Sequence, residues 1–381
     1  MFDGRSNTRR VAVATLTAAA LVALSACSEG VVDSGGGGGG DGDSPEVTLT
    51  LVTAAVESTP NAAVQDWFLD ELEERSDGRI AVERTEAYSL CDAPEIAECV
   101  RDGRAQIGVT IPDYTPEVFP STSVVSIPFL GQNWQAIMHS LHDLHVNNAD
   151  AQAQMESNGL HHVATWPVGR LLIGSNEPVS GPDDLSGLSM RVSGPLMQQL
   201  FENKGVNIQA IPAAEAYEAV ERGIVDSMAA GMDFPVDYQL REVLSHWTDP
   251  GIGQYSSFGM WMQLDAYESM PEDLQQVVDE VAAELSSGVG AQEFNETAAQ
   301  QCPPMMEAEN VEELSAWDES VTASWEDETG DTLQDAWVDL ATEQGLENAQ
   351  GVLDDYLAGL EEHAVDVDDA TLACIDEFQN S

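Results

Sequence analysis

The sequence has few basic side chains. It holds 13 Lys and Arg residues against 68 Asp and Glu residues, a formal net charge of -55, and Lys204 is its single lysine. Proteins that bind nucleic acid or an anionic membrane face electrostatically need clustered cations. The shortage therefore argues against nucleic acid as a partner. It is typical of a solvated acidic surface adapted to high salt, where ions screen the self-repulsion.

Enzyme motifs are also scarce. The sequence contains no G-x-S-x-G, H-E-x-x-H or P-loop pattern. His139, His142 and His145 recur every third residue, but such positions drift around a helix and do not converge, so a helix surface is expected rather than a metal site. His161 and His162 are adjacent on a predicted strand and point to opposite faces. We predict no enzyme, no cofactor and no metal site.

The N-terminal 27 residues have the layout of an export signal. Arginines at 5, 9 and 10 precede an apolar run from Val11 to Leu24, which is too short for an ordinary membrane-spanning helix. Leu24-Ser25-Ala26-Cys27 resembles the lipobox of bacterial lipoproteins, in which the cysteine is lipidated. A plain signal peptide with an incidental cysteine is the alternative. Cleavage before Cys27 removes three of the 13 cations and one of the 68 acidic residues.

Residues 28–45 contain six consecutive glycines between polar residues, and we interpret this stretch as a flexible tether. Together with lipidation at Cys27, it predicts a folded body held outside the cytoplasm at the membrane surface.

Four cysteines remain after Cys27. An exported chain lives in an oxidising space, so an even remainder suggests two disulfides, and four cysteines allow three pairings. We favour Cys91 with Cys99, and Cys302 with Cys374. The second bridge closes a large loop and would contribute roughly 4 kcal/mol in the chain-entropy model. Zinc binding is the rival, but the close C-x2-C spacing that it favours is absent.

The remaining pattern alternates between strands and helices, as in α/β proteins. The chain leaves a first domain near residue 167 and returns near 257. The predicted strands are 47–55, 80–84, 105–110, 161–166, 170–173, 190–192, 206–211 and 258–264, and the predicted helices are 60–75, one from about 92, 133–157, 271–300 and an acidic helical region over 311–360.

Two arginines stand in apolar surroundings beside predicted strands. Arg191 ends a short apolar run, and Arg170 precedes another. A buried guanidinium needs a partner, because leaving it unpaired is very costly, and its geometry matches a carboxylate in bidentate fashion. The partner is either internal, with Glu215 as the obvious candidate, or a ligand; the residues alone leave both open.

Several segments, in the right order, resemble the extracytoplasmic solute-binding proteins of TRAP transporters, the DctP-like family. The resemblance covers residues 46 to about 300. Its segments are Asp77-Gly78-Arg79-Ile80, Val100 to Gly108, Ile127-Pro128-Phe129-Leu130, Asp184 to Val192, Glu215-Ala216-Tyr217 and Gly223-Ile224-Val225-Asp226.

The resemblance implies a two-domain, periplasmic-binding-protein-like α/β fold with a ligand cleft between the domains and a long helix spanning the hinge. Domain I is expected at 46–167 plus 257–299, and domain II at 168–256 plus 300–378. The family delivers its solute to membrane permease subunits. In the family, the arginine at Arg191 binds the ligand carboxylate, and Arg170 matches a second arginine.

The expected ligand is a small organic acid. Besides Arg191 and Arg170, the residues expected around it are Glu215, Tyr217, Phe129, Trp166, Phe234 and Trp261. The sequence departs from many members in two places: no Asn stands in residues 226–233, and Ala213 and Ala214 replace an aromatic. These departures predict a roomier, less polar cleft than in binders of C4-dicarboxylates or sialic acid. A sensory lipoprotein that docks on a receptor, or an exported hydrolase or lyase on the same fold, are the alternatives.

Overall fold

The computed structural model describes residues 44–381, which form one compact unit. The predicted signal, Cys27 and nearly all of the predicted tether lie outside the described residues. Over residues 44–381, no helix is both long and apolar enough to cross a membrane.

The first sheet has five strands in the order β2-β1-β3-β10-β4. Strand β1 pairs in parallel with β2 and β3, whereas β10 runs antiparallel to β3 and β4. A chain that returns as an antiparallel strand after a long excursion agrees with the expected re-entry near residue 257. The strands are β1 (Val47–Thr53), β2 (Ile80–Glu83), β3 (Ile107–Thr110), β4 (Leu160–Pro167) and β10 (Ser257–Gln263).

The second sheet has six strands in the order β11-β9-β5-β8-β6-β7. On one side of it, β6 lies parallel to both β7 and β8, so the carboxyl ends of these three strands meet at one edge. The strands are β5 (Leu172–Ser175), β6 (Ser189–Arg191), β7 (Asn207–Gln209), β8 (Ser227–Ala230), β9 (His246–Asp249) and β11 (Glu313–Ala316).

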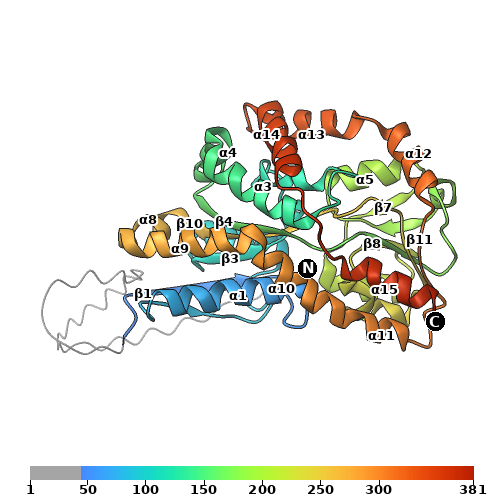
Figure 1. Cartoon of the computed structure of the whole chain (residues 1–381), viewed down its shortest axis with the longest axis horizontal. Helices are drawn as coiled ribbons and strands as arrows, with labels where there is room; N and C mark the ends of the chain where they lie inside the picture. The colour runs from blue at the N-terminus through green and yellow to red at the C-terminus, as the bar shows by residue number, and fades with distance from the viewer. Residues whose placement is uncertain (1–43) are drawn as a thin grey trace, which may run out of the picture. The chain divides into compact units, whose positions relative to one another are not determined.

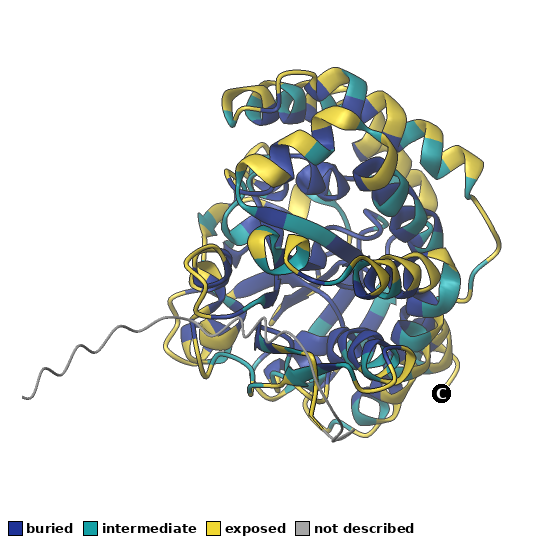
Figure 2. Cartoon of the chain, turned by 90° about the vertical axis from the view of Figure 1, so that its left-hand side faces the viewer, coloured by how far each residue is buried: buried dark blue, intermediate teal, exposed yellow. Residues whose placement is uncertain are grey.

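Helices cover both sheets (Figure 1). Strands are largely buried, and the exposed residues lie mostly on the outer faces of helices and on loops (Figure 2). The helices are α1 (Pro60–Arg75), α2 (Ile96–Arg101), α3 (Trp134–Asn147), α4 (Ala149–Ser157), α5 (Pro195–Glu202), α6 (Ala216–Glu221), α7 (Asp233–Val236), α8 (Leu264–Glu268), α9 (Glu272–Glu284), α10 (Gly290–Ala298), α11 (Cys302–Met306), α12 (Glu319–Thr329), α13 (Thr332–Glu343), α14 (Ala349–Glu362) and α15 (Ala370–Gln379).

Each sheet with the helices that cover it is called one half of the molecule, the first half holding the five-stranded sheet and the second half the six-stranded sheet. The C-terminal helices contact both halves. Helix α13 packs on α5 beside the second sheet, and α14 packs on α3 beside the first. Their shared core includes Leu141, Leu196 and Trp337. Helix α15 instead lies against α10, α11 and β11. Residues 300–378 were predicted to belong to domain II. Helix α14 packs against α3, which lies in the predicted domain I, so this assignment stays a prediction.

Several predicted helices are interrupted. The stretch 133–157 divides at Asn148, whose side chain caps α4. The stretch 271–300 kinks at Gly288, where a φ of +146° is open to glycine but strained for other residues. The helical region 311–360 divides at Gly330 and near Gly345, whereas Gly351 lies inside α14. Strands β8, β9 and β11 were not predicted, and β11 corrects the helical region expected over 311–360, which begins with a strand.

Both favoured disulfides are confirmed. Cys91 is bonded to Cys99, and Cys302 is bonded to Cys374. The second bridge ties the start of α11 to α15. It therefore fixes the C-terminal helix against the second half of the molecule.

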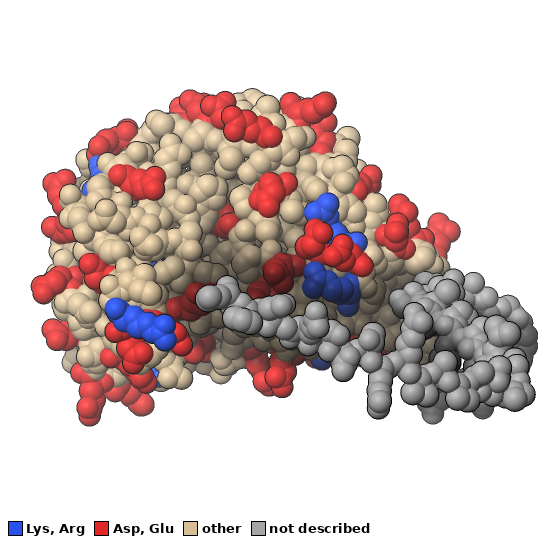
Figure 3. Space-filling view, turned by 180° about the vertical axis from the view of Figure 1, so that it is seen from behind, with Lys and Arg blue, Asp and Glu red and all other residues tan. Residues whose placement is uncertain are grey.

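Acidic side chains are spread over the surface, whereas the few basic ones form small groups (Figure 3). Arginines near the surface form ion pairs with the acidic side chains. An Nη atom of Arg79 lies 2.7 Å from a Glu46 carboxylate oxygen, and one of Arg84 lies 2.6 Å from an Asp70 oxygen. Exposed pairs of this kind contribute little to stability. The two arginines singled out in the sequence are both buried.

Candidate functional site

Arg191 ends β6 at the edge where three parallel strands terminate. The chain then turns at Gly194, whose φ is +80°, and Pro195 occupies the first position of α5. A Cβ on Gly194 would lie 2.9 Å from the Asp113 carboxyl carbon, so glycine is needed both for the turn and for this approach. Asp113 follows β3 of the first sheet. The turn thus places Arg191 where the two sheets meet.

Arg191 is 1% exposed, and no carboxylate lies within 4.0 Å of its guanidinium among residues 44–381. Its Nε donates to the Ile211 carbonyl at 2.8 Å, and one Nη lies 3.5 Å from the Tyr114 hydroxyl. The guanidinium carbon stands 4.7 Å above the centre of the Phe234 ring, a cation–π contact. The other Nη has no hydrogen-bond partner among the described residues.

Two small cavities flank Arg191. One of about 20 Å³ is lined by Arg191 itself and, among others, Asp233, Phe234, Tyr238 and Phe258. The other, of about 180 Å³, is lined by Tyr114, Ile211 and Asp113 among others. The two share Ser193, whose buried hydroxyl has no partner among residues 44–381. Both cavities draw residues from the two halves of the molecule.

Two buried carboxyl groups accompany the guanidinium. Burial and, to a smaller extent, the charge of Asp237 raise the pKa of Asp233 to about 7, although the charge of Arg191 opposes the shift. Burial also raises the pKa of Asp113, opposed by hydrogen bonds from Ser256 and Ser126 and by Arg191. The site therefore combines one cation with carboxyl groups that are easily neutralised.

Tyrosine hydroxyls supply most of the remaining polar groups, and the sequence analysis missed them. Tyr114 accepts a hydrogen bond from the Ala213 backbone N–H at 3.2 Å. Tyr255 accepts one from the Gly231 N–H at 3.0 Å, and the hydroxyls of Tyr88 and Tyr238 lie 3.2 Å apart. Each pair joins residues distant in sequence. The proline-rich stretch around Tyr114 gave no local signal of this role.

Arg170 lies apart from both cavities. Its Nε is 2.9 Å from Asp369 and its Nη1 is 3.3 Å from Asp249, with the side chain 8% exposed. Asp369 also caps α15 by accepting hydrogen bonds from two backbone N–H groups. The structure thus brings Arg170 into an internal ion cluster and not beside Arg191.

Glu215, the internal partner considered for Arg191, does not pair with it. Glu215 is exposed and forms no ion pair with Arg191. Tyr217 is half-buried, and its hydroxyl donates to Glu242 at 3.4 Å, away from the two cavities. Of the expected site residues, Arg191 and Phe234 line one cavity together.

The other predicted aromatics belong to the core. Trp166 is fully buried and stacks on Phe258, and Trp261 stacks on Phe119 with a centroid distance of 4.1 Å. Phe129 packs edge-on against Trp325. None of the three predicted residues lines the cavities beside Arg191. A buried aromatic in an apolar strand has the same local pattern whether it faces a core or a ligand.

A larger cavity of about 560 Å³ lies elsewhere, on the first half of the molecule. It is lined by α3, α4, β4 and α9, including His161, His162, Glu156 and Asp279. No Lys or Arg lines it, and its carboxylates would repel an organic anion. The cavities beside Arg191, although smaller, are the better candidate for anion binding.

Residues 52–336 match the family described as Bacterial extracellular solute-binding protein, family 7. The chain belongs to this family. Its members bind solutes outside the cytoplasm and are not enzymes, which removes the hydrolase or lyase alternative. The resemblance noted in the sequence is thereby confirmed.

Named relatives and solved structures similar to this chain are also solute-binding proteins. The C4-dicarboxylate-binding periplasmic protein DctP of Rhodobacter capsulatus is 24% identical over 69% of this chain and 81% of its own length. A TRAP solute-binding protein from Rhodoferax ferrireducens, solved with benzoate, has a TM-score of 0.74 at 20% identity, covering 83% of this chain and 98% of its own. The ectoine-binding protein of Halomonas elongata has a TM-score of 0.69 at 19% identity, covering 83% and 99%. The two-sheet α/β fold is therefore that of TRAP solute-binding proteins.

Proposed function

We propose that this chain captures a small organic monocarboxylate, with Arg191 as the group that holds the carboxylate. The observation that carries the proposal is a buried guanidinium that has no acidic partner among residues 44–381, where the two halves meet. Leaving such a charge unpaired is costly, and a ligand carboxylate would pair with it. The Ser193 hydroxyl, which also has no partner in the described part of the chain, is available as a donor to the same carboxylate.

The surroundings favour one carboxylate over two. Arg191 is the one Lys or Arg among the described residues that line the two cavities. Asp113 and Asp233 stand nearby and oppose a second anionic group when ionised. Phe234, Tyr238 and Phe258 provide an apolar, aromatic wall. A monocarboxylate with a flat apolar body, of the benzoate class, fits these properties.

A thermal-shift comparison in about 1–2 M salt, which screens the acidic surface, tests the proposal. Benzoate, succinate and ectoine represent an aromatic monocarboxylate, a dicarboxylate and a zwitterion. We expect benzoate at a hundredfold excess over its Kd to stabilise the fold by about 2.7 kcal/mol, and succinate to do less. A shift confined to succinate or ectoine contradicts the choice of ligand class.

We propose further that the chain is a lipoprotein anchored through Cys27 and that it delivers its ligand to TRAP permease subunits. The lipobox-like Leu24-Ser25-Ala26-Cys27 and the glycine-rich stretch after it support the anchor. The Cys27→Ala variant should be absent from the membrane fraction, whereas the wild-type protein should be found in it. Genes for the two permease subunits beside this gene would support transport, and a receptor gene there instead would favour sensing.

A further inference from the structure

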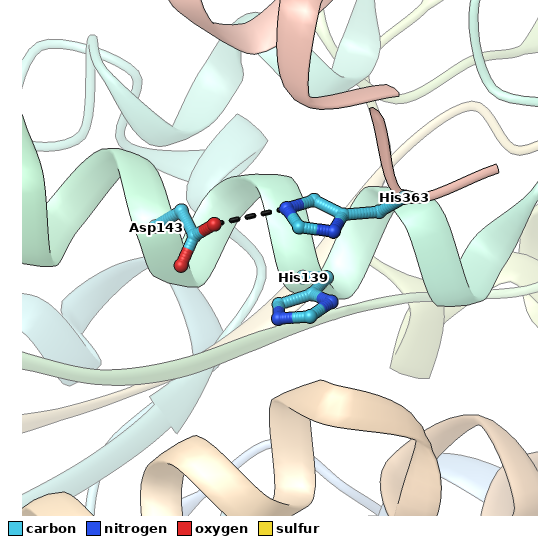
Figure 4. Close-up of side chains that lie close together, drawn as sticks. All are labelled: His139, Asp143 and His363. Carbon is cyan, nitrogen blue, oxygen red and sulfur yellow. Dashed lines mark hydrogen bonds and ion pairs between the residues drawn. The ribbon is translucent and has the colours of Figure 1, made fainter. Parts of the chain in front are cut away.

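Three side chains with metal-binding atoms meet where α14 lies on α3. His139 and Asp143 are four residues apart on one face of α3, and His363 follows the end of α14 (Figure 4). One donor atom from each lies within 4.8 Å of the others. We propose that these three residues bind a divalent transition-metal ion of the zinc class, at a site separate from that of Arg191.

The ligand set favours such an ion. Imidazole nitrogens suit zinc, nickel, copper and cobalt, whereas calcium and magnesium prefer oxygen ligands alone. Two histidines and one carboxylate leave a fourth position for water in a tetrahedral site. Asp143 is 43% exposed on its side chain, so solvent reaches the site.

The three side chains are close enough to share an ion once the histidine rings rotate, because a ring nitrogen binds a metal in the plane of its ring and the two rings now stack face to face. His363 Nε2 is already 2.9 Å from an Asp143 carboxylate oxygen, and the His139 and His363 rings stack with centroids 3.7 Å apart. Ligand atoms around a tetrahedral zinc ion are about 3–3.5 Å apart, from the usual bond lengths. An ion held by His363 Nε2 and an Asp143 oxygen would take the place of the hydrogen bond between them, with the imidazole hydrogen carried on Nδ1.

The packing of the two helices fixes this meeting point. Gly359 on α14 lies over Ser140 on α3, and a Cβ on Gly359 would be 2.8 Å from the Ser140 hydroxyl. Only a glycine allows this approach, and His363 follows it by one turn. Beyond the site, the Asn133 side chain donates to the Val365 carbonyl. A bound ion would therefore fasten the C-terminal helices to the first half of the molecule.

The histidine series in the sequence pointed to a different triple. His142 and His145 do not join the group: His145 is buried against Ser121 and stacks on His162. The helix surface expected for the series is wrong for His145, which lies in the core, and the series led to the prediction of no metal site. His363 is 220 residues from Asp143, and no local spacing indicates their proximity.

The experiment measures metal uptake by the full chain in the presence of excess Mg²⁺, which occupies the acidic surface. We expect one equivalent of Zn²⁺ per chain, a rise in Tm, and visible ligand-field absorption when Co²⁺ replaces Zn²⁺. His139→Ala, Asp143→Asn and His363→Ala should each weaken Zn²⁺ binding at least 10-fold. Glu347→Gln, which removes an exposed carboxylate without a hydrogen-bond partner among residues 44–381, should leave it unchanged.

Benzoate binding, measured on the same variants, separates this site from that of Arg191, and we expect no change there. Zn²⁺ uptake that is equal in the wild type and in the three site variants would mean adsorption to the acidic surface and would overturn the proposal. Absence of stoichiometric uptake by the folded wild type would overturn it as well.

Discussion

Arg170 and Arg191 are both buried arginines next to strands of the second sheet, yet their surroundings differ. Arg170 is paired with Asp249 and Asp369 and helps to hold the start of α15. Arg191 touches a carbonyl, a tyrosine hydroxyl and an aromatic ring, and no carboxylate lies within ion-pair distance of it among residues 44–381. The difference shows that burial alone does not define the role of a cation: the Arg170 charge is satisfied internally, whereas that of Arg191 is left for the ligand that we propose.

The largest effect on stability is expected at Arg170. Arg170→Met leaves Asp249 and Asp369 buried without their cation, and breaking a buried pair in this way typically costs 3–5 kcal/mol. Denaturant unfolding should show this loss. Arg79→Met, which removes an exposed arginine paired with Glu46 and Asp273, is the matched control and should change little. Equal stability of the two variants would contradict a structural role for Arg170.

Asp233 should make the stability of the Arg191 region depend on pH. Its carboxyl pKa is about 7 in the folded state against 3.8 for the ordinary group, so the folded state holds the proton more tightly. The resulting stabilisation is complete below about pH 4 and is lost as pH rises through 7, by roughly 4 kcal/mol in total. Asp233→Asn should remove this component from the pH dependence of unfolding, whereas Glu347→Gln should not. An unchanged pH profile in the Asn variant would rule out the raised pKa.

Phe234 gives the smallest expected effect. Phe234→Leu removes the ring beneath the Arg191 guanidinium while keeping an apolar side chain. A cation–π contact of this kind is worth about 1 kcal/mol, which corresponds to roughly a fivefold loss of benzoate affinity. Phe258→Leu, in the same cavity but without a cation–π contact to Arg191, controls for lost apolar area. Equal losses in both variants would assign the effect to area alone.

Much of the fold was predictable because its signals are local. The helix over 60–75 begins and ends where predicted, and both cysteine pairings are confirmed. Strands β8, β9 and β11 were missed: β8 reads Ser-Met-Ala-Ala, without a β-branched or aromatic residue, and β11 lies in an acidic stretch that was interpreted as helical. The kink at Gly288 was also missed, because an isolated glycine is compatible with a continuous helix.

The site was predictable only in part, for a related reason. Arg191 and Phe234 were found because a scarce cation and an aromatic stand out in a stretch with a recognisable motif. Tyr114, Tyr255 and Asp233 reach the site through contacts between distant segments. Trp166 and Trp261 satisfy the same apolar pattern but fill the core, and Asp369, the partner of Arg170, lies 199 residues away.

Calorimetric titration of benzoate into the wild type, Arg191→Ala and Arg170→Met, in about 1–2 M salt, tests the central claim most directly. We expect Arg191→Ala to remain folded and to lose 2–5 kcal/mol of binding free energy, roughly 30- to 5,000-fold in Kd. Arg170→Met should bind nearly as tightly as the wild type wherever it is folded. Unchanged affinity in folded Arg191→Ala, or an equal loss in folded Arg170→Met, would contradict the account.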